Sequence, residues 1–235
     1  GVMQNYFSKL GIPITGCGLK QSELTFDKIK CLKFLRNKGI RTAKSISVKK
    51  NIKIKSEKIQ EEIGFPCFIK ASKSGSSFGV YKVYNQEEFI NCLNSAFEID
   101  DEILVETFIE GREFSIGVLT YKNKVTVLPI TEIIASNDFF DYEAKYEGKS
   151  QEITPAKIDD KLKDKLNKIS KDIYNIIGLK GFSRSEFIVN KDGIYFLETN
   201  TVPGLTSESI LPQQAQHAGI SLEDLFVNSI YEVIK

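Results

Sequence analysis

The chain has 235 residues, of which 41% are hydrophobic and 27% charged, and its formal net charge is +1. This composition is typical of a globular protein with one large core or two smaller ones. The balanced charge excludes the basic surface of a protein that binds nucleic acid or anionic membranes. No apolar run approaches the ~18 residues of a transmembrane helix, and no basic stretch followed by an apolar one predicts a secretory leader.

Apolar periodicity and breaker residues divide the first part of the chain into short elements. The expected elements are a helix at 3–10, a strand at 12–15, a helix at 26–38, strands at 65–70 and 79–83, and a helix at 86–97. Gly39 ends the second helix, and Asn85 is a favourable N-cap for the third.

Strands dominate the second part of the chain. The expected elements are strands at 103–108, 113–120 and 125–130, a polar loop at 134–156, a helix at 159–177, strands at 181–189 and 194–199, and a helix from Ser221. Gly178 ends the long helix, and Asp224 stands where a capping box needs its acid. Hairpins combined with helices predict an α+β fold, in which helices pack on antiparallel sheets.

The cysteines and the single histidine limit the chemistry that is available. Cys17, Cys31, Cys67 and Cys92 are far apart and form no C-x-x-C pair, which predicts free thiols and a reducing cytoplasm. His217 is predicted to lie at a helix end rather than to act as a catalytic base. Any catalysis therefore depends on carboxylates, Lys, Arg, Tyr or a carboxylate-bound cation.

The most informative feature is a hairpin with the turn Asn190-Lys191-Asp192-Gly193. If the turn centres on Asp192, Glu186 faces Glu198 and Arg184 faces Asn200, whereas a bulge at Gly193 would shift the register by one residue. Carboxylate and amide oxygens are the hard ligands that Mg²⁺ prefers. The alternative is a solvated sheet face with scattered charges.

Three other segments carry candidate functional residues. The loop KSGSSFG at 73–79 can turn backbone N–H groups towards an anion, and Lys70 adds a positive charge beside it. The loop matches neither the Walker A motif nor the dinucleotide fingerprint, and a plain hairpin turn is the alternative. Segments 106–113 and 142–146 are rich in charge and aromatic side chains, which is typical of binding segments and equally of surface turns.

Six features occur in a fixed order. They are Lys28 and the segments FIKASKSGSSFGV at 68–80, VETFIEGRE at 105–113, FDYEAKY at 140–146, GFSRSEF at 181–187 and LETNTVPGLT at 197–206. In this order they resemble the D-alanine–D-alanine ligases, which are ATP-grasp enzymes. The resemblance covers nearly the whole chain. It implies that ATP lies between two α+β subdomains at 19–105 and 106–235, with residues 1–18 as a remnant of an N-terminal substrate domain.

The resemblance also implies a role for each matching residue. Lys28, Lys70, Lys145 and the loop that contains Ser76 would contact the phosphates. Glu106 and the backbone near Ile109 would contact adenine, and Glu113 would contact the ribose. Two Mg²⁺ ions, or Mn²⁺, would be held by Glu186, Glu198 and Asn200. The reacting groups would be oriented or stabilised by Tyr146, Arg184 and the Gly204 backbone, and the carboxylate of the second D-alanine would be bound by Ser209 and Ile210.

The sequence departs from the family pattern at two positions. Residue 186 is Glu where Asp is commoner, so a bound cation would shift slightly. Residue 107 is Thr where many relatives have Lys near adenine. The family's acidic anchor for the first D-alanine falls outside the matching residues. We therefore expect these 235 residues alone to bind ATP but to form little D-alanyl-D-alanine.

The implied activity is the ATP-dependent ligation of two D-alanines through an acyl phosphate, for peptidoglycan precursor synthesis. The implied partners are ATP and D-alanine, with neither nucleic acid nor membrane, and a homodimer in the full-length enzyme. The alternatives are another ATP-grasp carboxylate–amine ligase, a D-alanine–D-lactate ligase, or an ATP-binding module without catalysis. Tyr146 favours an amine as the nucleophile, by analogy.

Overall fold

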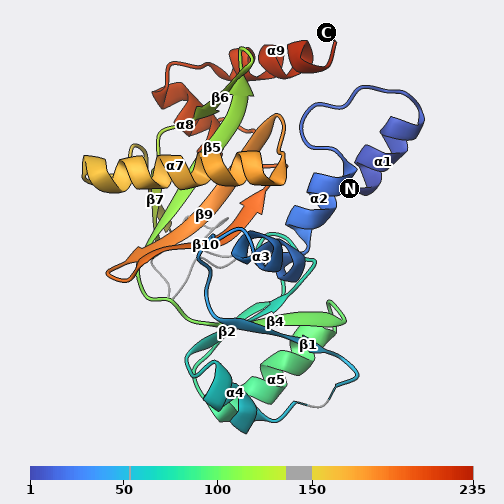
Figure 1. Cartoon of the computed structure of the whole chain (residues 1–235), viewed down its shortest axis with the longest axis vertical. Helices are drawn as coiled ribbons and strands as arrows, with labels where there is room; N and C mark the ends of the chain where they lie inside the picture. Colours follow the sequence, from blue (N-terminus) through green and yellow to red (C-terminus); the bar gives the residue numbers. More distant parts are fainter. Residues whose placement is uncertain (53, 136–149, 235) are drawn as a thin grey trace. The chain divides into compact units, whose positions relative to one another are not determined.

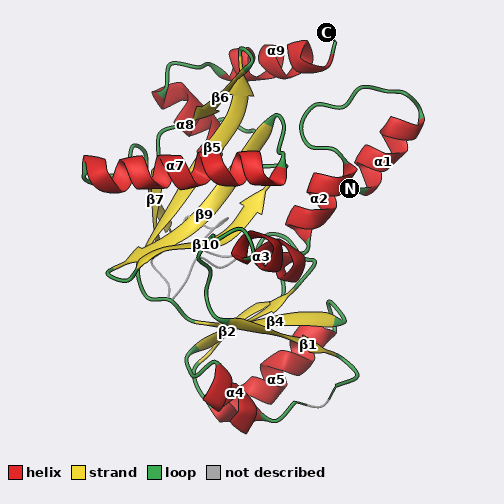
Figure 2. Ribbon diagram, in the orientation of Figure 1, coloured by secondary structure: helices red, strands yellow, loops and turns green. Residues whose placement is uncertain are grey.

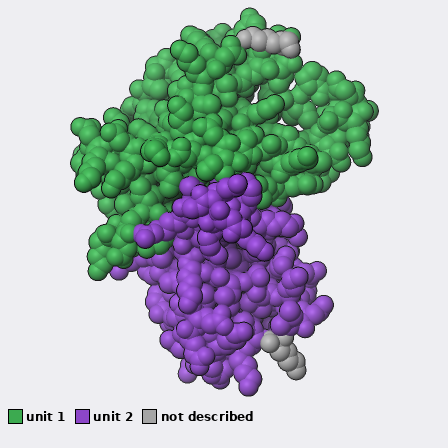
Figure 3. All heavy atoms as spheres, in the orientation of Figure 1, with its two compact units in different colours: residues 1–25, 112–134, 151–235 green, residues 26–111, 135–150 purple. Residues whose placement is uncertain are grey.

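The computed structural model describes residues 1–52, 54–135 and 150–234 (Figure 1). Helices and antiparallel strands are interspersed along the chain, so the predicted α+β class is confirmed (Figure 2). The chain forms two compact units, which Figure 3 colours separately. Unit 1 comprises residues 1–25, 112–134 and 151–235, and unit 2 comprises 26–111 and 135–150. The division at residues 18 and 105 that the resemblance implies stays a prediction.

Unit 2 is built on a four-stranded antiparallel sheet with the strand order β1-β4-β2-β3. Its elements are α3 (Lys28–Arg36), β1 (Ser45–Lys49), α4 (Ser56–Glu62), β2 (Cys67–Ala71), β3 (Val80–Val83), α5 (Gln86–Phe97) and β4 (Glu102–Thr107). The Asn85 side chain accepts hydrogen bonds from the backbone N–H groups of Glu87 and Glu88, and so caps α5 as predicted. Helix α5 buries Phe89, Leu93 and Ala96 in the core shared with the sheet.

Unit 1 contains the remaining elements, apart from the end residues Phe26, Ala135 and Ser150. These elements are α1 (Val2–Lys9), α2 (Leu19–Phe26), β5 (Arg112–Tyr121), β6 (Lys124–Val127), β7 (Thr131–Ala135), β8 (Ser150–Ile153), α7 (Asp160–Ile177), β9 (Phe182–Asn190), β10 (Gly193–Asn200), α8 (Ile210–His217) and α9 (Leu222–Val233). The larger sheet has the order β10-β9-β5-β7-β8, and β6 pairs with β5.

The face of the larger sheet that α7 covers is apolar (Figure 1). Phe114, Phe187 and Phe196 are paired side by side across β5, β9 and β10 and are at most 1% exposed. Thr120 lies on the same face of β5 as Phe114, and its hydroxyl is 2.9 Å from that of Tyr174 in α7. The opposite face of β5 therefore carries Glu113, Ser115 and Gly117.

A β-bulge at Leu197 sets the register of the β9–β10 hairpin. Near the turn, Phe196 pairs with Phe187, but beyond Leu197 the register shifts and Glu198 pairs with Glu186. The predicted pairings of Glu186 with Glu198 and of Arg184 with Asn200 are confirmed. The alternative, in which a bulge at Gly193 shifts this pairing, does not occur, because the irregularity lies at Leu197. The extra residue points Phe196 and Glu198 to opposite faces of the sheet.

Most predicted elements are confirmed to within a few residues. They include the helices at 3–10, 86–97 and 159–177, the strands on either side of the 72–77 loop, and the last helix with its Ser221–Asp224 capping box. Gly178 ends α7 in a left-handed conformation with φ of 71°. His217 lies in the last turn of α8. The long helix presents one stripe to the core, where Leu166 and Ile173 are fully buried.

Three predictions about elements are wrong. Residues 12–15 form no strand, because no strand in the described part of the chain pairs with them. The helix predicted at 26–38 begins at Lys28, because Asp27 is its N-cap, and a separate helix, α2, precedes it. The segment at 134–156, predicted to be a long loop, begins in β7 and contains β8.

The four cysteines are free thiols, as predicted, and Cys17, Cys31 and Cys67 are buried. None of the helices in the described part of the chain combines the length and apolar character that crossing a lipid bilayer requires.

Candidate functional site

The polar face of the β9–β10 hairpin brings four of the predicted residues together. Glu186 and Glu198 are cross-strand partners, and the next pair on the same face is Arg184 with Asn200. Arg184 Nη2 lies 3.0 Å from Glu186 Oε1 in an ion pair. Asn200 Nδ2 donates to Glu198 Oε1 at 3.4 Å. The bulge at Leu197 therefore assembles a compact set of two carboxylates, one guanidinium and one amide.

Burial makes the Glu186 carboxylate an unusual group. The residue is 4% exposed, and its Oε1 accepts no well-aligned hydrogen bond in the described part of the chain, although the Arg184 guanidinium is nearby. The Nε of Arg184 is likewise buried, and none of the described residues accepts a hydrogen bond from it. Two facing carboxylates repel each other unless positive charge lies between them. A buried carboxylate beside a second carboxylate and an amide oxygen fits a hard divalent cation.

Metal-binding clusters of three or more His, Cys, Asp or Glu side chains are absent from the described residues. The candidate set is consistent with this finding, because it has two carboxylates and takes its third oxygen from the amide of Asn200. Glu186, Glu198 and Asn200 therefore stay the predicted metal ligands.

Two polar residues beside this set were not predicted from the sequence. Ser115 of β5 pairs with Glu186, and its buried hydroxyl has no hydrogen-bond partner in the described part of the chain. Glu152 of β8 has a raised pKa, because burial and the Glu186 charge outweigh the lowering effect of Arg184. Strand alternation could have identified Ser115, which is two residues after Glu113 on one face. No local pattern marked Glu152.

The loop after β10 brings Gly204 close to Ser209. A side chain at Gly204 would place its Cβ 2.6 Å from Ser209 Oγ, so only glycine allows this approach. Ser209 is the N-cap residue of α8, its hydroxyl is 2.9 Å from that of Thr206, and Ile210 opens the helix with 6% exposure. Three predicted residues therefore lie together at the start of α8.

Unit 2 holds a second group of predicted residues, on β2 and β4. Lys70 Nζ lies 2.5 Å from Glu106 Oε1, and the Glu106 residue is only 5% exposed. The Lys70 ammonium group is also 4.9 Å from the centre of the Phe68 ring. Phe68 packs near Phe108, with ring centroids 6.0 Å apart, and Ile109 follows directly in the chain. A cation, a buried acceptor and two aromatic rings therefore lie side by side.

Lys28 and Ser76 belong to unit 2 as well. Lys28 is the first residue of α3, and its Nζ donates to Ser74 O at 2.7 Å, within the loop that follows β2. Ser76 and Ser77 both have positive φ, at 51° and 58°. A left-handed conformation in two successive non-glycine residues is uncommon and turns backbone N–H groups in unusual directions. Lys28 is thus in contact with the predicted phosphate loop.

The contacts described so far place three predicted residues neither in the hairpin set of unit 1 nor in the group on β2 and β4 of unit 2. Glu113 pairs with Ile188 on β9 and Ile133 on β7, on the same face as Ser115. Lys145 and Tyr146 lie outside the described residues.

Comparisons with known proteins identify the family to which the chain is similar. The model of the D-Ala–D-Ala ligase C-terminus family matches residues 34–231. The chain is 52% identical to a D-alanine–D-alanine ligase of Flavobacterium johnsoniae and 49% identical to one of Christiangramia forsetii. In both cases the match spans 98% of this chain and 71% of the relative.

Solved structures show the same fold. The VanG D-Ala:D-Ser ligase from Enterococcus faecalis matches with a TM-score of 0.86 and 33% identity, over 98% of this chain and 68% of that one. The D-alanine–D-alanine ligase from Bacillus anthracis complexed with ATP matches with a TM-score of 0.84 and 29% identity, over 99% and 75%. The predicted ATP-grasp fold is therefore confirmed, and this chain belongs to the D-alanine–D-alanine ligase family.

Proposed function

We propose that this chain is the ATP-binding and catalytic part of an enzyme that ligates two D-alanines to D-alanyl-D-alanine, through an acyl phosphate, for the synthesis of peptidoglycan precursors. The observation that carries the proposal is the bulge at Leu197, which places Glu198 and Asn200 on the same face as Glu186 and Arg184. A solvated face with scattered charges would not bury Glu186 to 4% exposure.

The reaction explains why such residues are needed. A carboxylate reacts poorly with amines because its leaving group would be oxide. Its oxygen therefore attacks the γ-phosphorus of ATP and releases ADP, which leaves an acyl phosphate. The amine of the second D-alanine then attacks the acyl carbon, phosphate leaves, and the nitrogen loses a proton. Glu186, Glu198 and Asn200 would hold Mg²⁺ ions, which when bound neutralise charge on the phosphates.

The chain's own residues would bind and orient the reactants. Lys28 and Lys70 would contact the phosphates, and the pairing of Lys70 with Glu106 fixes that lysine beside an acceptor for the adenine amino group. The Arg184 guanidinium and the Gly204 backbone would stabilise the oxyanion that forms when the amine attacks. Ile109 would contact adenine, Glu113 the ribose, and Lys145 and Ser76 the phosphates. Tyr146 would orient the reacting groups. Ser209 and Ile210 would bind the carboxylate of the second D-alanine.

D-alanine is the second substrate that the comparisons favour. The relatives at 52% and 49% identity carry the name D-alanine–D-alanine ligase, whereas the D-Ala:D-Ser ligase is 33% identical. Phosphate release by the full-length enzyme should therefore be faster with D-alanine than with D-serine or D-lactate as the second substrate. Cytoplasmic location and a homodimer stay predictions.

Binding of ATP with and without Mg²⁺ tests the proposal directly. Calorimetry should show that Mg²⁺ tightens ATP binding to the chain, and Glu198→Gln should remove that gain while the melting temperature without ligand stays the same. Glu223→Gln, on the exposed side of α9, is the matched control and should keep the gain. Phosphate release with D-alanine by the full-length enzyme should follow the same order.

Two results would contradict the proposal. One is the absence of ATP binding at millimolar concentration with Mg²⁺ present. The other is an undiminished effect of Mg²⁺ in Glu198→Gln.

A further inference from the structure

Asp27 is a buried carboxylate beside the predicted phosphate loop, although the proposed function gives it no contact with substrate. The residue is 2% exposed and is the N-cap of α3. Its Oδ1 accepts a hydrogen bond from the backbone N–H of Lys30 at 3.1 Å. Its Oδ2 lies 3.1 Å from Lys30 Nζ. Its charge is thus offset locally, which limits its repulsion of any nearby phosphate.

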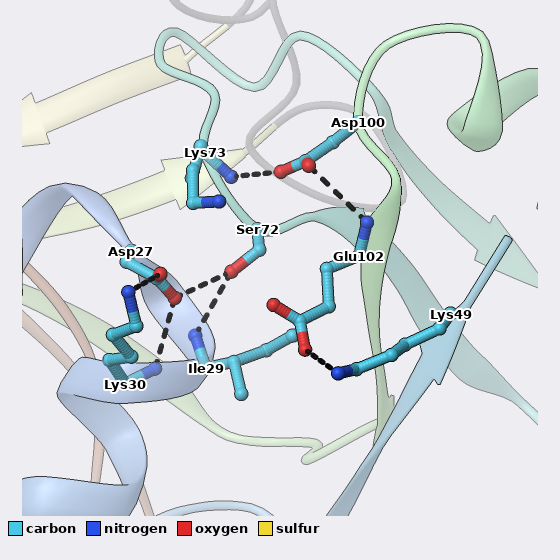
Figure 4. A network of polar contacts seen from close by, with 8 residues as sticks. All are labelled: Asp27, Ile29, Lys30, Lys49, Ser72, Lys73, Asp100 and Glu102. Carbon is cyan, nitrogen blue, oxygen red and sulfur yellow. Dashed lines mark hydrogen bonds and ion pairs between the residues drawn. The ribbon is translucent and has the colours of Figure 1, made fainter.

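The same carboxylate holds the start of the loop at 72–79. Ser72 Oγ donates to Asp27 Oδ1 at 2.9 Å and accepts from the backbone N–H of Ile29 at 3.3 Å. The backbone N–H of Lys28 donates to Ser72 O at 3.0 Å. Three hydrogen bonds therefore connect residue 72 to the first turn of α3 and its cap, which lie more than 40 residues earlier in the chain. Figure 4 shows the two that the Ser72 hydroxyl forms, with Asp27 and with Ile29.

A second carboxylate holds the loop from the other side. Asp100 Oδ2 accepts from the backbone N–H of Lys73 at 2.7 Å, and its Oδ1 accepts from that of Glu102 at 3.3 Å. The backbone N–H of Ser72 donates to Glu102 O at 3.1 Å. Ser72 is therefore anchored both to α3 and to the start of β4, and Lys73 is anchored to Asp100, which lies just before β4 (Figure 4).

These contacts determine how the two candidate phosphate-binding lysines are related. Lys28 follows Asp27 directly, and Lys70 precedes Ser72 by two residues on β2. The Asp27–Ser72 hydrogen bond therefore fixes the first turn of α3 against the end of β2. Lys28 Nζ is in turn bonded to Ser74 O at 2.7 Å. Without the Asp27–Ser72 bond, the lysine and the loop would have to be ordered by the nucleotide, which costs binding free energy.

We propose that Asp27 and Ser72 are positioning residues for ATP, which hold Lys28 and the loop at 72–79 in the arrangement that binds phosphate before the nucleotide arrives. The inference rests on the proposed function, in which Lys28 and Lys70 contact phosphate. It assigns to Asp27 a role through other residues and no contact with the substrate.

The test compares ATP with adenosine, which has no phosphates. Ser72→Ala and Asp27→Ala should raise the Kd for ATP about tenfold, the equivalent of ~1.4 kcal/mol. Displacement of a fluorescent ATP analogue by adenosine should be unchanged in both. Asp27→Asn should bind ATP nearly as the native chain does, because its amide oxygen can still accept from Lys30 and Ser72.

Matched controls separate positioning from loss of stability. Asp159→Ala removes the N-cap of α7, whose side chain accepts from Leu162 N at 2.8 Å, and Ser170→Ala removes a buried hydroxyl bonded to Leu166 O at 2.8 Å. Both controls should lower the melting temperature and leave the Kd for ATP unchanged.

Each outcome decides between the two proposals. Two outcomes would overturn the positioning role alone. In the first, Ser72→Ala and Asp27→Ala weaken the binding of ATP and of adenosine equally. In the second, both variants bind ATP as tightly as the native chain, whereas Lys28→Ala binds it weakly. Native affinity in both Lys28→Ala and Lys70→Ala would overturn the phosphate contacts of the proposed function, and the positioning role with them.

Discussion

Replacing Gln214 with alanine should destabilise unit 1 more than any surface change on the same helix. The Gln214 side chain of α8 is fully buried against the larger sheet. Its Nε2 donates to Ser115 O at 2.8 Å and to Thr131 Oγ1 at 2.9 Å, and its Oε1 accepts from Gly117 N at 2.9 Å. Alanine can form none of these three hydrogen bonds.

The size of the effect follows from the groups left behind. Thr131 keeps its 2.6 Å contact with Thr154, so the loss falls mainly on the backbone groups of Ser115 and Gly117. A buried polar group without a partner costs about 1–3 kcal/mol. We therefore expect Gln214→Ala to lower the free energy of unfolding by about 2–6 kcal/mol, a large part of the ~5–15 kcal/mol that stabilises a typical domain.

Urea unfolding, with hydrogen exchange at the Gly117 amide as a local probe, measures this loss. The control is Gln213→Ala, which removes only an exposed hydrogen bond to Glu208 O at 3.0 Å and should change stability by less than about 0.5 kcal/mol. The reasoning is refuted if the two variants unfold at the same urea concentration and exchange the Gly117 amide at the same rate.

Two further predictions concern ionisable groups. Burial raises the pKa of the Cys67 thiol to about 12 and also raises that of Cys92. A thiol reagent at pH 8 should therefore modify the native chain slowly and reach all four cysteines only in denaturant. Rapid reaction of several native thiols would contradict this. Burial favours a higher pKa for Asp27, but hydrogen bonds from Lys30 and Ser72 and the Lys30 charge lower it overall. A depressed pKa gives stability that is present above the unfolded value of about 3.9 and is lost as the pH falls through the native pKa. Asp27→Asn should therefore lose less stability than the native chain on acidification below about pH 4, and equal losses in urea titrations would show that Asp27 is not the group responsible.

The elements that could be predicted are those whose own residues determine them. Helix α7 has a continuous apolar stripe and a glycine directly after its last residue, and α5 and α9 each begin directly after a capping side chain, Asn85 and Ser221. By contrast, β1 and α4 were not predicted, because each buries a single residue, Val48 and Ile59, and shows no periodic pattern. Their conformation is determined by the neighbouring strand and helix in the folded unit.

The hairpin shows the same limit at the level of single side chains. Its turn and its face-to-face carboxylates could be predicted, but the bulge at Leu197 could not. Strict alternation would put Phe196 and Glu198 on one face, yet Phe196 packs against Phe187 in the core and Glu198 faces Glu186. Only the packing of the sheet reveals that an extra residue must separate them. The burial of Gln214 could not be predicted for a similar reason, since an isolated glutamine in a helix indicates a surface position.

The contacts of the N-terminal segment have a consequence for the order in which the protein folds on the ribosome. Cys17 Sγ donates to Lys180 O at 3.3 Å, 163 residues later in the chain, and Gly181 leaves no room for a Cβ beside the backbone of Gly16. All four strands of the smaller sheet lie between residues 45 and 107. At synthesis rates of ~5–20 residues per second, that sheet is complete several seconds before residue 181 is made. The segment at 1–25 therefore emerges before the smaller sheet, yet its partners at residues 180 and 181 are made only after that sheet.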